Sequence, residues 1–425
     1  MIRNNETVIV EIQKRPFVRP LIFWIVGILL YVYFPLQQIS LIFPAAVFVF
    51  IIISIFSVEK TTRSNYDDRW VWGVIFACLT VFLSIQITAL KEASLLHPSM
   101  PGFLMQKAKE LQLTMVEKLD VLRLPDNDKS VLATITVNYR NAMSWDLRNM
   151  FSATGVSHIL SVSGYHVGIV CAFAGFVLSI IPKRRRALRI VKFLLIILCV
   201  WVFTFISGLN TAAVRAAFML SVFLMAKVLN RYSDRYNYFA GSAFCMLVYN
   251  PFYLFDIGFQ LSYVAVFFLL YLQPKLSSIL EIKNPLLKIP WNILTVTVAA
   301  QTGTLFLCFF YFGRSSAVFL FTNLIMSMLS SIIIPATLIF MILPSWFPGI
   351  GILQFIIEHT TKYMMWIIER FASMPYATFS MKFDFLTVLL AYLSLVLFLI
   401  YMRNRNYWLL LSSLFVFLII LVKNL

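Results

Sequence analysis

The sequence predicts an all-α fold: a polytopic membrane bundle of about 11–13 transmembrane or interfacial helices, some of them broken in the core. The first observation is composition, because 61% of the 425 residues are hydrophobic and the mean hydropathy is +0.87. A soluble domain carries far less apolar surface. The second is that apolar segments long enough to cross a bilayer recur from end to end. Together they exclude a water-soluble fold.

The candidate spanning helices share long apolar runs with few charges. They are 20–36, 41–57, 70–90, 157–181, 193–209, 213–230, 237–250, 256–272, 290–311, 317–343, 351–372, 383–402 and 407–422. No small-residue cleavage site follows the first, so we interpret it as a retained helix and not a signal peptide. Segment 351–372 places Glu358 and Lys362 on one face. It therefore either crosses the membrane or lies flat in the interface.

The charge pattern supports this topology. The formal net charge is +17, and if the N-terminus is cytoplasmic and the spans alternate, most Lys and Arg residues fall inside. The densest group is a cytoplasmic basic turn made of Lys183, Arg184, Arg185, Arg186, Arg189 and Lys192. This pattern predicts a multi-pass membrane protein whose basic turns face the cytoplasm. Anchoring accounts for the basic balance without a nucleic-acid-binding arm.

The chain divides into four predicted regions. They are an N-terminal three-helix membrane unit at 1–90, an extracytoplasmic connecting segment at 91–153, a transmembrane core at 154–343 and C-terminal membrane helices at 344–425. We expect the connecting segment to form short surface helices, one of which, near 145–150, rests on the bilayer face. All five cysteines lie in apolar segments without paired spacing, which predicts small buried residues and neither a disulfide nor a metal site.

The most informative stretch is residues 154–168, TGVSHILSVSGYHVG, where polar side chains interrupt an apolar run. They are His158, Ser161, Ser163 and His166. Polar groups at membrane depth are costly and usually functional. Gly164 and Gly168 are predicted helix breaks, which membranes tolerate only where protein or a watery cavity satisfies the backbone. The functional interpretation is a polar path; the alternative is close helix packing at the two glycines, with each histidine bonded to a neighbouring carbonyl.

A second set of polar residues lies in the later spans. Arg215 needs a partner at its depth, and we hypothesise that Asp256 provides it across the bundle. The alternative is that both side chains reach the outer interface. Pro251 is a third predicted helix break, and Gln260 continues the polar face of Asp256. Further along, the uncharged residues Gln301 and Asn323 either line the same path or tie helices together.

The chain shows no arrangement typical of a soluble enzyme. Its four histidines form neither HxHxDH nor HExxH spacing, and no Walker-type phosphate loop occurs. A hydrolytic site on Ser163 and His166 is disfavoured, because the sequence has no GxSxG and no orienting acid nearby. We therefore expect no catalytic residues, no metal and no cofactor.

Several motifs in order closely resemble the integral-membrane competence domain of ComEC-type DNA-uptake proteins. They are YRNAMSWDLRNMFSATGVSHILSVSGYHVGIV, SGLNTAAVRAAFML, NPFYLFDIGFQLSYVAV and AAQTGTLFLCFFYFG, followed by Asn323 and Pro335. The resemblance covers about 115–345 and, more weakly, RPFVRPLIFWIVGILL near the start. It departs at Tyr165, where the family usually has leucine, and at residues 136–138. The family's external OB-like domain and its metallo-β-lactamase-like nuclease domain have no counterpart in this sequence, which predicts a short form.

The resemblance implies an inner-membrane channel component for uptake of single-stranded DNA during natural transformation. It acts alone or as a homo-oligomer, within membrane lipid, alongside a separate DNA receptor, nuclease and cytoplasmic motor. Two alternatives stay open: a small-solute or ion transporter, and a non-transporting scaffold derived from the family. A polyanion path should be electropositive, yet Arg215 is the one cation away from the ends of the core spans, since Lys227 lies near the end of 213–230. We expect helix N-termini at Gly164 and Pro251 to add partial positive charge, and the basic turn from Lys183 to Lys192 to receive the emerging strand.

Overall fold

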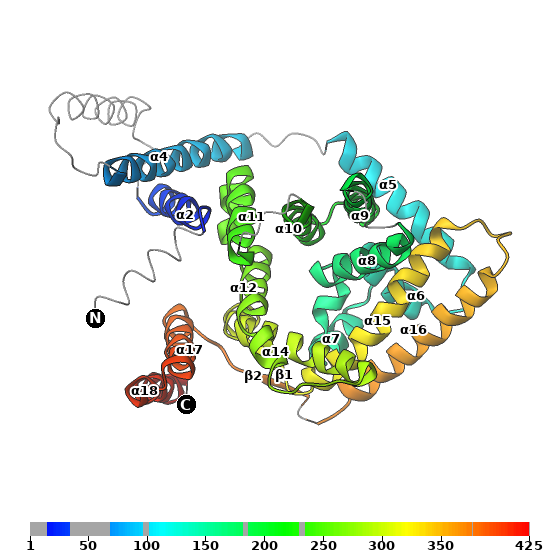
Figure 1. Cartoon of the computed structure of the whole chain (residues 1–425). Helices are drawn as coiled ribbons and strands as arrows, with labels where there is room; N and C mark the ends of the chain where they lie inside the picture. Colours follow the sequence, from blue (N-terminus) through cyan, green and yellow to red (C-terminus); the bar gives the residue numbers. More distant parts are fainter. Residues whose placement is uncertain are drawn as a thin grey trace. The chain divides into compact units, whose positions relative to one another are not determined.

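The computed structural model of the chain describes residues 15–34, 69–96, 102–181, 186–228, 234–375 and 377–424. Almost every described segment is helical, which confirms the predicted all-α polytopic fold (Figure 1). Six of the described helices are long and apolar enough to cross a membrane, namely α4, α9, α10, α14, α15 and α17. Shorter apolar helices are α2, α8 with η4, α12 and α18. The predicted span at 41–57 lies outside the described residues.

Two compact units make up the chain. The first comprises residues 1–102 and 218–260. Its elements include α2 (Val18–Tyr33), α4 (Arg69–Leu96), α11 (Arg235–Tyr249) and η5 (Pro251–Phe255). Helices α2 and α4 pack closely at Gly27, where an added Cβ would lie 2.7 Å from the Ser84 Cβ. The Ser84 hydroxyl donates to the Trp24 carbonyl at 2.7 Å. Small residues thus let these two apolar helices approach.

The second unit comprises residues 103–217 and 261–425 and contains most of the predicted core. Its first elements are α5 (Phe103–Glu117), η2 (Lys118–Val121), α6 (Asp126–Val137), α7 (Trp145–Ala153), η3 (Ser157–Leu160), α8 (Gly164–Val177), η4 (Leu178–Ile180) and α9 (Arg186–Ile206). Its later elements are α13 (Gln273–Ser277), α14 (Pro285–Phe312), β1 (Arg314–Ser316), α15 (Phe319–Ile342), α16 (Ile350–Ala372), β2 (Thr378–Ser380), α17 (Phe385–Asn404) and α18 (Tyr407–Asn424). The unit boundaries fall within α10 (Thr211–Val228) and α12 (Ile257–Tyr271).

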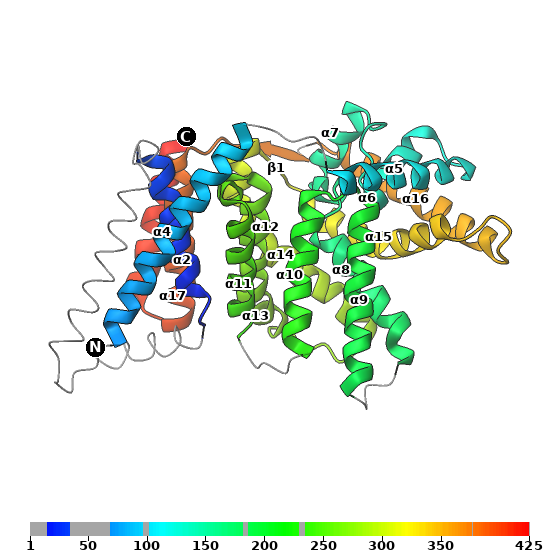
Figure 2. The same cartoon turned by 90° about the horizontal axis from the view of Figure 1, so that it is seen from above.

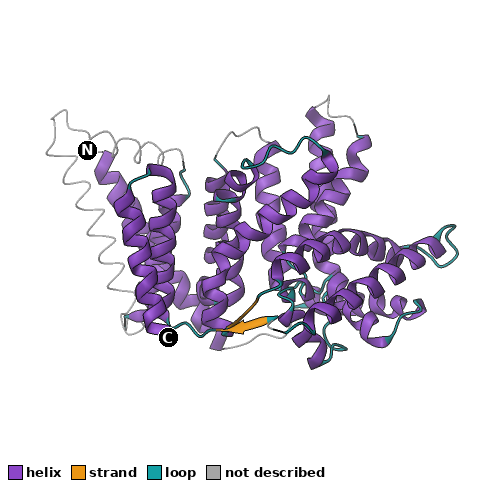
Figure 3. Ribbon diagram, turned by 90° about the horizontal axis from the view of Figure 1, so that it is seen from below, coloured by secondary structure: helices purple, strands orange, loops and turns teal. Residues whose placement is uncertain are grey.

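Within the second unit, helices run in two directions. Figure 2 shows α9, α14 and α17 upright, whereas α15 and α16 run crosswise to α9, side by side as a hairpin. Crosswise helices cannot all be perpendicular to one bilayer, so α15 and α16 cannot cross in the manner of α9. The strands β1 and β2 form a short antiparallel ribbon that joins the ends of this hairpin (Figure 3).

Polar contacts hold the C-terminal hairpin of α17 and α18 together, both inside the pair and at its open end. Ser394 and Ser413 exchange hydroxyl-to-carbonyl hydrogen bonds of 3.0 and 2.9 Å inside the pair. At the start of α17, Asp384 caps the helix, and its two carboxylate oxygens accept hydrogen bonds from the Lys423 ammonium group at 2.7 and 2.9 Å. These contacts lower the pKa of the Asp384 carboxyl, chiefly through Lys423. The hairpin is thereby closed at its open end.

The connecting segment is less exposed than the sequence predicts. Every residue of α6 from Val131 to Val137 is buried, so the expectation of surface helices is wrong for α6. It packs against α15 and α16. The helix near 145–150, predicted to rest on the bilayer face, is exposed only in part, because Leu147 and Phe151 are buried in the unit while Trp145 is exposed. The segment is therefore part of the core of the second unit.

The buried start of α6 makes its stability sensitive to pH. Burial raises the pKa of the Asp128 carboxyl, Glu369 of α16 raises it further, and Lys362 opposes both. Because the folded-state pKa is raised, the protonated carboxyl favours the folded state more than the ionised carboxyl does. This contribution to stability is complete below the unfolded-state pKa and is lost as pH rises through the folded-state pKa. We therefore expect Asp128→Asn to stabilise the protein at neutral pH and to lose that advantage on acidification. Thermal unfolding of both proteins across pH tests this. An equal gap at all pH values would contradict it.

Candidate functional site

The sequence stretch 154–168 folds into η3, a short extended segment and the first turns of α8. Ser163 caps α8 by accepting the Tyr165 N–H at 3.3 Å, and the Ser163 N–H donates to His166 Nδ1 at 3.3 Å. The Ser163 hydroxyl lies 3.0 Å from the same ring nitrogen. This is a capping box in which histidine occupies the third position. His166 is fully buried. Since Nδ1 is an acceptor, the pair stabilises a helix end, and this explains its proximity without nucleophilic chemistry.

His158 is exposed and lies at the centre of a polar group. It lies close enough to the Asn323 side chain and the Gly155 backbone to interact with them electrostatically. It is also close enough to His166 for the two rings to interact electrostatically. The structure therefore brings the predicted residues His158, His166 and Asn323 together, although His158 and Asn323 are 165 positions apart in the sequence.

Asn323 extends this group into two further helices. Its Nδ2 donates to the Thr297 hydroxyl of α14 at 2.7 Å, and the Ser327 hydroxyl donates to its Oδ1 at 3.5 Å. One turn along α15, Tyr165 of α8 donates to the Ser327 carbonyl at 2.5 Å and lies 3.0 Å from the Ser331 hydroxyl. We call this connected set the polar seam: His158, Tyr165, Thr297, Asn323, Ser327 and Ser331.

Other predicted residues lie beside the seam. Ser161 accepts a 3.4 Å hydrogen bond from Asn210 Nδ2, which also donates to the Val162 carbonyl at 3.2 Å. Gln301 is half-buried on α14, four positions after Thr297 and hence on the same helix face. The loop after η3 is thus tied to the start of α10, and the neutral polar face of α14 continues past the seam.

Arg215 also belongs to the second unit; it lies near the start of α10 and is 3% exposed. Asp256 and Gln260 belong to the first unit, where Asp256 accepts the Phe259 N–H at 2.7 Å and Gln260 donates to the Leu254 carbonyl at 2.9 Å. Asp256 therefore serves as a helix cap. Because Arg215 and Asp256 belong to different units, their pairing stays a prediction.

The predicted breaks have different outcomes. Helix α8 begins at Gly164, and η5 begins at Pro251 after α11 ends at Tyr249. Gly168 lies inside α8, so a break at Gly168 is wrong. An added Cβ at Gly168 would meet nothing within 4 Å, so close packing does not explain this glycine either. In the basic turn, Lys183, Arg184 and Arg185 lie outside the described residues.

A family model, "Competence protein", matches residues 135–406, well over half of the chain. The chain belongs to this competence protein family. It is also 26% identical over 208 residues to ComE operon protein 3 of Bacillus subtilis (strain 168). That match covers 48% of this chain and 25% of the relative, so the chain spans only a fraction of the relative's length. No solved structure matches.

The competence-family match includes every residue of the polar seam. With six helices capable of spanning among its described residues, the chain is a multi-pass membrane protein with a competence-related function. Sequence reasoning missed Thr297, Ser327 and Ser331. A usable signal existed on α15, because 323, 327 and 331 recur every four residues and so share one helix face.

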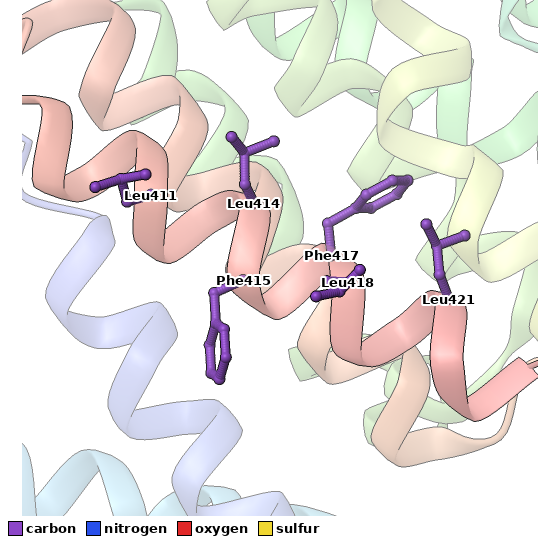
Figure 4. A pocket seen from close by; sticks show the side chains of 6 residues that line it. All are labelled: Leu411, Leu414, Phe415, Phe417, Leu418 and Leu421. Atoms are coloured by element: carbon purple, nitrogen blue, oxygen red, sulfur yellow. The ribbon is translucent and has the colours of Figure 1, made fainter.

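A recess on α18 is apolar and offers no polar group for chemistry. It has a volume of about 580 Å³ and lies on α18, where Figure 4 shows its side chains. It is lined by Leu411, Leu414, Phe415, Phe417, Leu418 and Leu421. Such a surface suits acyl chains or an apolar helix and offers no group that orients a polar substrate. The polar seam is accordingly the better candidate site.

Tyr165 provides a direct test of the seam's packing. Its hydroxyl joins α8 to α15, and a net hydrogen bond contributes about 0.5–1.5 kcal/mol. We expect Tyr165→Phe to lower the free energy of unfolding by about 1–2 kcal/mol. Tyr407→Phe is the matched control, since Tyr407 is 63% exposed at the start of α18. Thermal unfolding in detergent measures both. Equal midpoints for the two variants would show that the contact contributes nothing.

Proposed function

We propose that this competence-family chain forms part of the path by which single-stranded DNA crosses the bacterial inner membrane. The observation that carries the proposal is the polar seam, in which side chains of η3, α8, α14 and α15 form a connected polar set within an apolar helical unit, partly buried and partly exposed. Polar groups at this depth are costly and mark transport pathways in membrane proteins. The family match adds a competence-related role.

The chemistry of the seam fits a mobile polyanion in one respect. Its hydroxyl, amide and imidazole groups can donate to phosphate oxygens without the strong fixed attraction of a buried ammonium or guanidinium group. A strand that must leave the site requires such weak contacts, as conduction does in channels. Helix α8 begins beside the seam, and its N-terminal end contributes a partial positive charge. A separate DNA receptor, a nuclease, a cytoplasmic motor and a second copy of the chain are proposed partners, because the family resemblance implies them.

The test is transformation frequency in a strain lacking this gene, complemented with wild type or with His158→Ala. We expect wild type to restore transformation and His158→Ala to reduce it by at least about tenfold, the effect of one lost charge-assisted contact. His359→Ala is the matched control, because His359 is exposed on α16 and bonds only its own helix, at the Phe355 carbonyl. Membrane levels of each variant are measured by immunoblot.

A small-solute transporter is the second candidate, and the uncharged character of the seam favours it. Both hypotheses require His158, so the cargo separates them. In proteoliposomes, uptake of a labelled ion or solute that depends on His158, with normal transformation in the His158→Ala strain, would replace the DNA proposal. Transformation that is unchanged in the deletion strain would reject the DNA path directly.

A further inference from the structure

The first turns of α9 contain two basic side chains that are set apart from the polar seam. Arg189 and Lys192 are three positions apart and therefore share one helix face. Lys192 is only 8% exposed, and the Nε of Arg189 is buried without a hydrogen-bond partner. Within the described part of the chain, neither side chain takes part in an ion pair. Two cations thus lie close together with no carboxylate to balance them.

This arrangement is unfavourable for the protein alone. An uncompensated buried charge costs several kcal/mol, because water no longer solvates it and no counter-charge replaces the water. A stable arrangement therefore requires an anion from outside this part of the chain. Arg189 offers a planar set of donors that matches phosphate oxygens, and Lys192 adds a compact positive charge.

The surroundings of the pair are apolar and exposed. Helices α8 and α9 pack against each other, and an added Cβ at Gly175 would lie 4.0 Å from the Ile196 side chain. Lys192 is one turn nearer the connection between the two helices. Beside this end, Phe176 is 76% exposed and Ile180 is 87% exposed, and Leu194 on α9 is 58% exposed. The ligand must therefore satisfy cations and cover apolar side chains at once.

The position along α9 agrees with a membrane headgroup. Helix α9 is long and apolar enough to cross a bilayer. Lys192 lies six residues after its first residue, Arg186, which is about 9 Å along the axis at 1.5 Å per residue. Phosphate groups of lipids occupy this depth, between the hydrocarbon core and water. A single DNA strand would use only the Phe176 ring, because bases bind proteins by stacking on aromatic rings, and it would leave Ile180 and Leu194 uncovered.

We propose that Arg189 and Lys192 bind the phosphate of an anionic phospholipid at the ends of α8 and α9. The acyl chains of this lipid cover Phe176, Ile180 and Leu194. The site is separate from the polar seam, and it accounts for the buried Lys192 and the half-buried Arg189, which the seam does not use.

The test measures lipid bound to the purified full-length protein in a zwitterionic detergent. The protein is titrated with phosphatidylglycerol or phosphatidylcholine, and bound lipid is counted by native mass spectrometry. We expect wild type to prefer phosphatidylglycerol and the double variant Arg189→Gln/Lys192→Gln to lose about tenfold in affinity for it. Lys288→Gln is the matched control, since Lys288 is exposed near the start of α14. Equal binding by wild type and double variant overturns the proposal.

A second variant keeps the test valid if the double variant folds poorly. Lys192→Met removes the buried charge while keeping the chain length, so we expect it to unfold at the same temperature as wild type or higher in lipid-free detergent. Added phosphatidylglycerol should raise the unfolding temperature of wild type and of Lys288→Gln more than that of Lys192→Met. An equal rise in all three overturns the proposal. If the basic variants instead lose binding of a single-stranded oligonucleotide while keeping the lipid, the site belongs to nucleic acid and the lipid proposal fails.

Discussion

Replacing Gly155 with alanine should prevent the second unit from folding stably. Gly155 has φ +78°, and an added Cβ would lie 2.6 Å from the Phe319 Cβ and 2.8 Å from the Ser316 Cβ. The left-handed backbone costs an alanine about 1–2 kcal/mol, and overpacking adds about 1–3 kcal/mol. The start of α15 would have to move, and His158, which lies within reach of the Gly155 backbone, would move with it. We expect a loss of about 2–5 kcal/mol in unfolding free energy.

The matched control for this change is Gly168→Ala, in the same sequence stretch. Gly168 lies inside α8, and an added Cβ there meets nothing within 4 Å. Alanine also favours helix over glycine by roughly 1 kcal/mol. Thermal unfolding in detergent should therefore show Gly168→Ala at or above the wild-type midpoint and Gly155→Ala far below it. Similar midpoints for the two variants would mean that the turn at Gly155 is not packed as described.

The second large effect is expected at Asn323, where the contacts of the seam converge. Asn323→Ala leaves the Thr297 hydroxyl, the Ser327 hydroxyl and His158 without this partner. An unsatisfied buried polar group costs about 1–3 kcal/mol. We expect Asn323→Ala to lower transformation at least as strongly as His158→Ala. Asn404→Ala is the control, because Asn404 is exposed at the end of α17.

A double variant distinguishes a shared role from two separate ones. If Asn323 and His158 act through one contact, His158→Ala/Asn323→Ala should be little worse than either single variant, since residues in one network are not additive. Transformation frequencies of the four strains give this comparison, with membrane levels measured alongside. Fully additive losses would mean that the two residues act independently and that the seam is not one functional network.

Much of the helical framework could be predicted from hydropathy, because apolar runs of sufficient length specify membrane helices strongly. Helix α6 shows where this reasoning fails. Its sequence carries Ser130, Thr134 and Thr136, which resemble surface positions. In the structure, the Thr134 and Thr136 hydroxyls donate to carbonyls four residues earlier, at 2.7 and 2.6 Å. These bonds satisfy the hydroxyls inside the helix, so burial costs little.

The site was predicted in part, for a related reason. Costly groups such as His158, His166 and Asn323 stand out in an apolar sequence. Hydroxyl groups do not, because a serine or threonine in a membrane helix can bond its own backbone. Ser331 does this, donating to the Ser327 carbonyl at 2.8 Å. Only the packing of α15 against both α8 and α14 assigns Thr297, Ser327 and Ser331 to one network with Tyr165. Likewise, the crosswise direction of α15 and α16 follows from tertiary contacts and not from their hydropathy.

The most direct test of the DNA path is photo-crosslinking of incoming DNA at the polar seam. A photoreactive phenylalanine derivative replaces Ser157, which is exposed beside His158, in a strain that still transforms. The control places it at Leu418, which is 56% exposed on the apolar face of α18. During uptake of labelled DNA, we expect single-stranded DNA to crosslink at position 157 and not at position 418. Efficient transformation without crosslinking at 157, or with equal crosslinking at both positions, would contradict a DNA path along the polar seam.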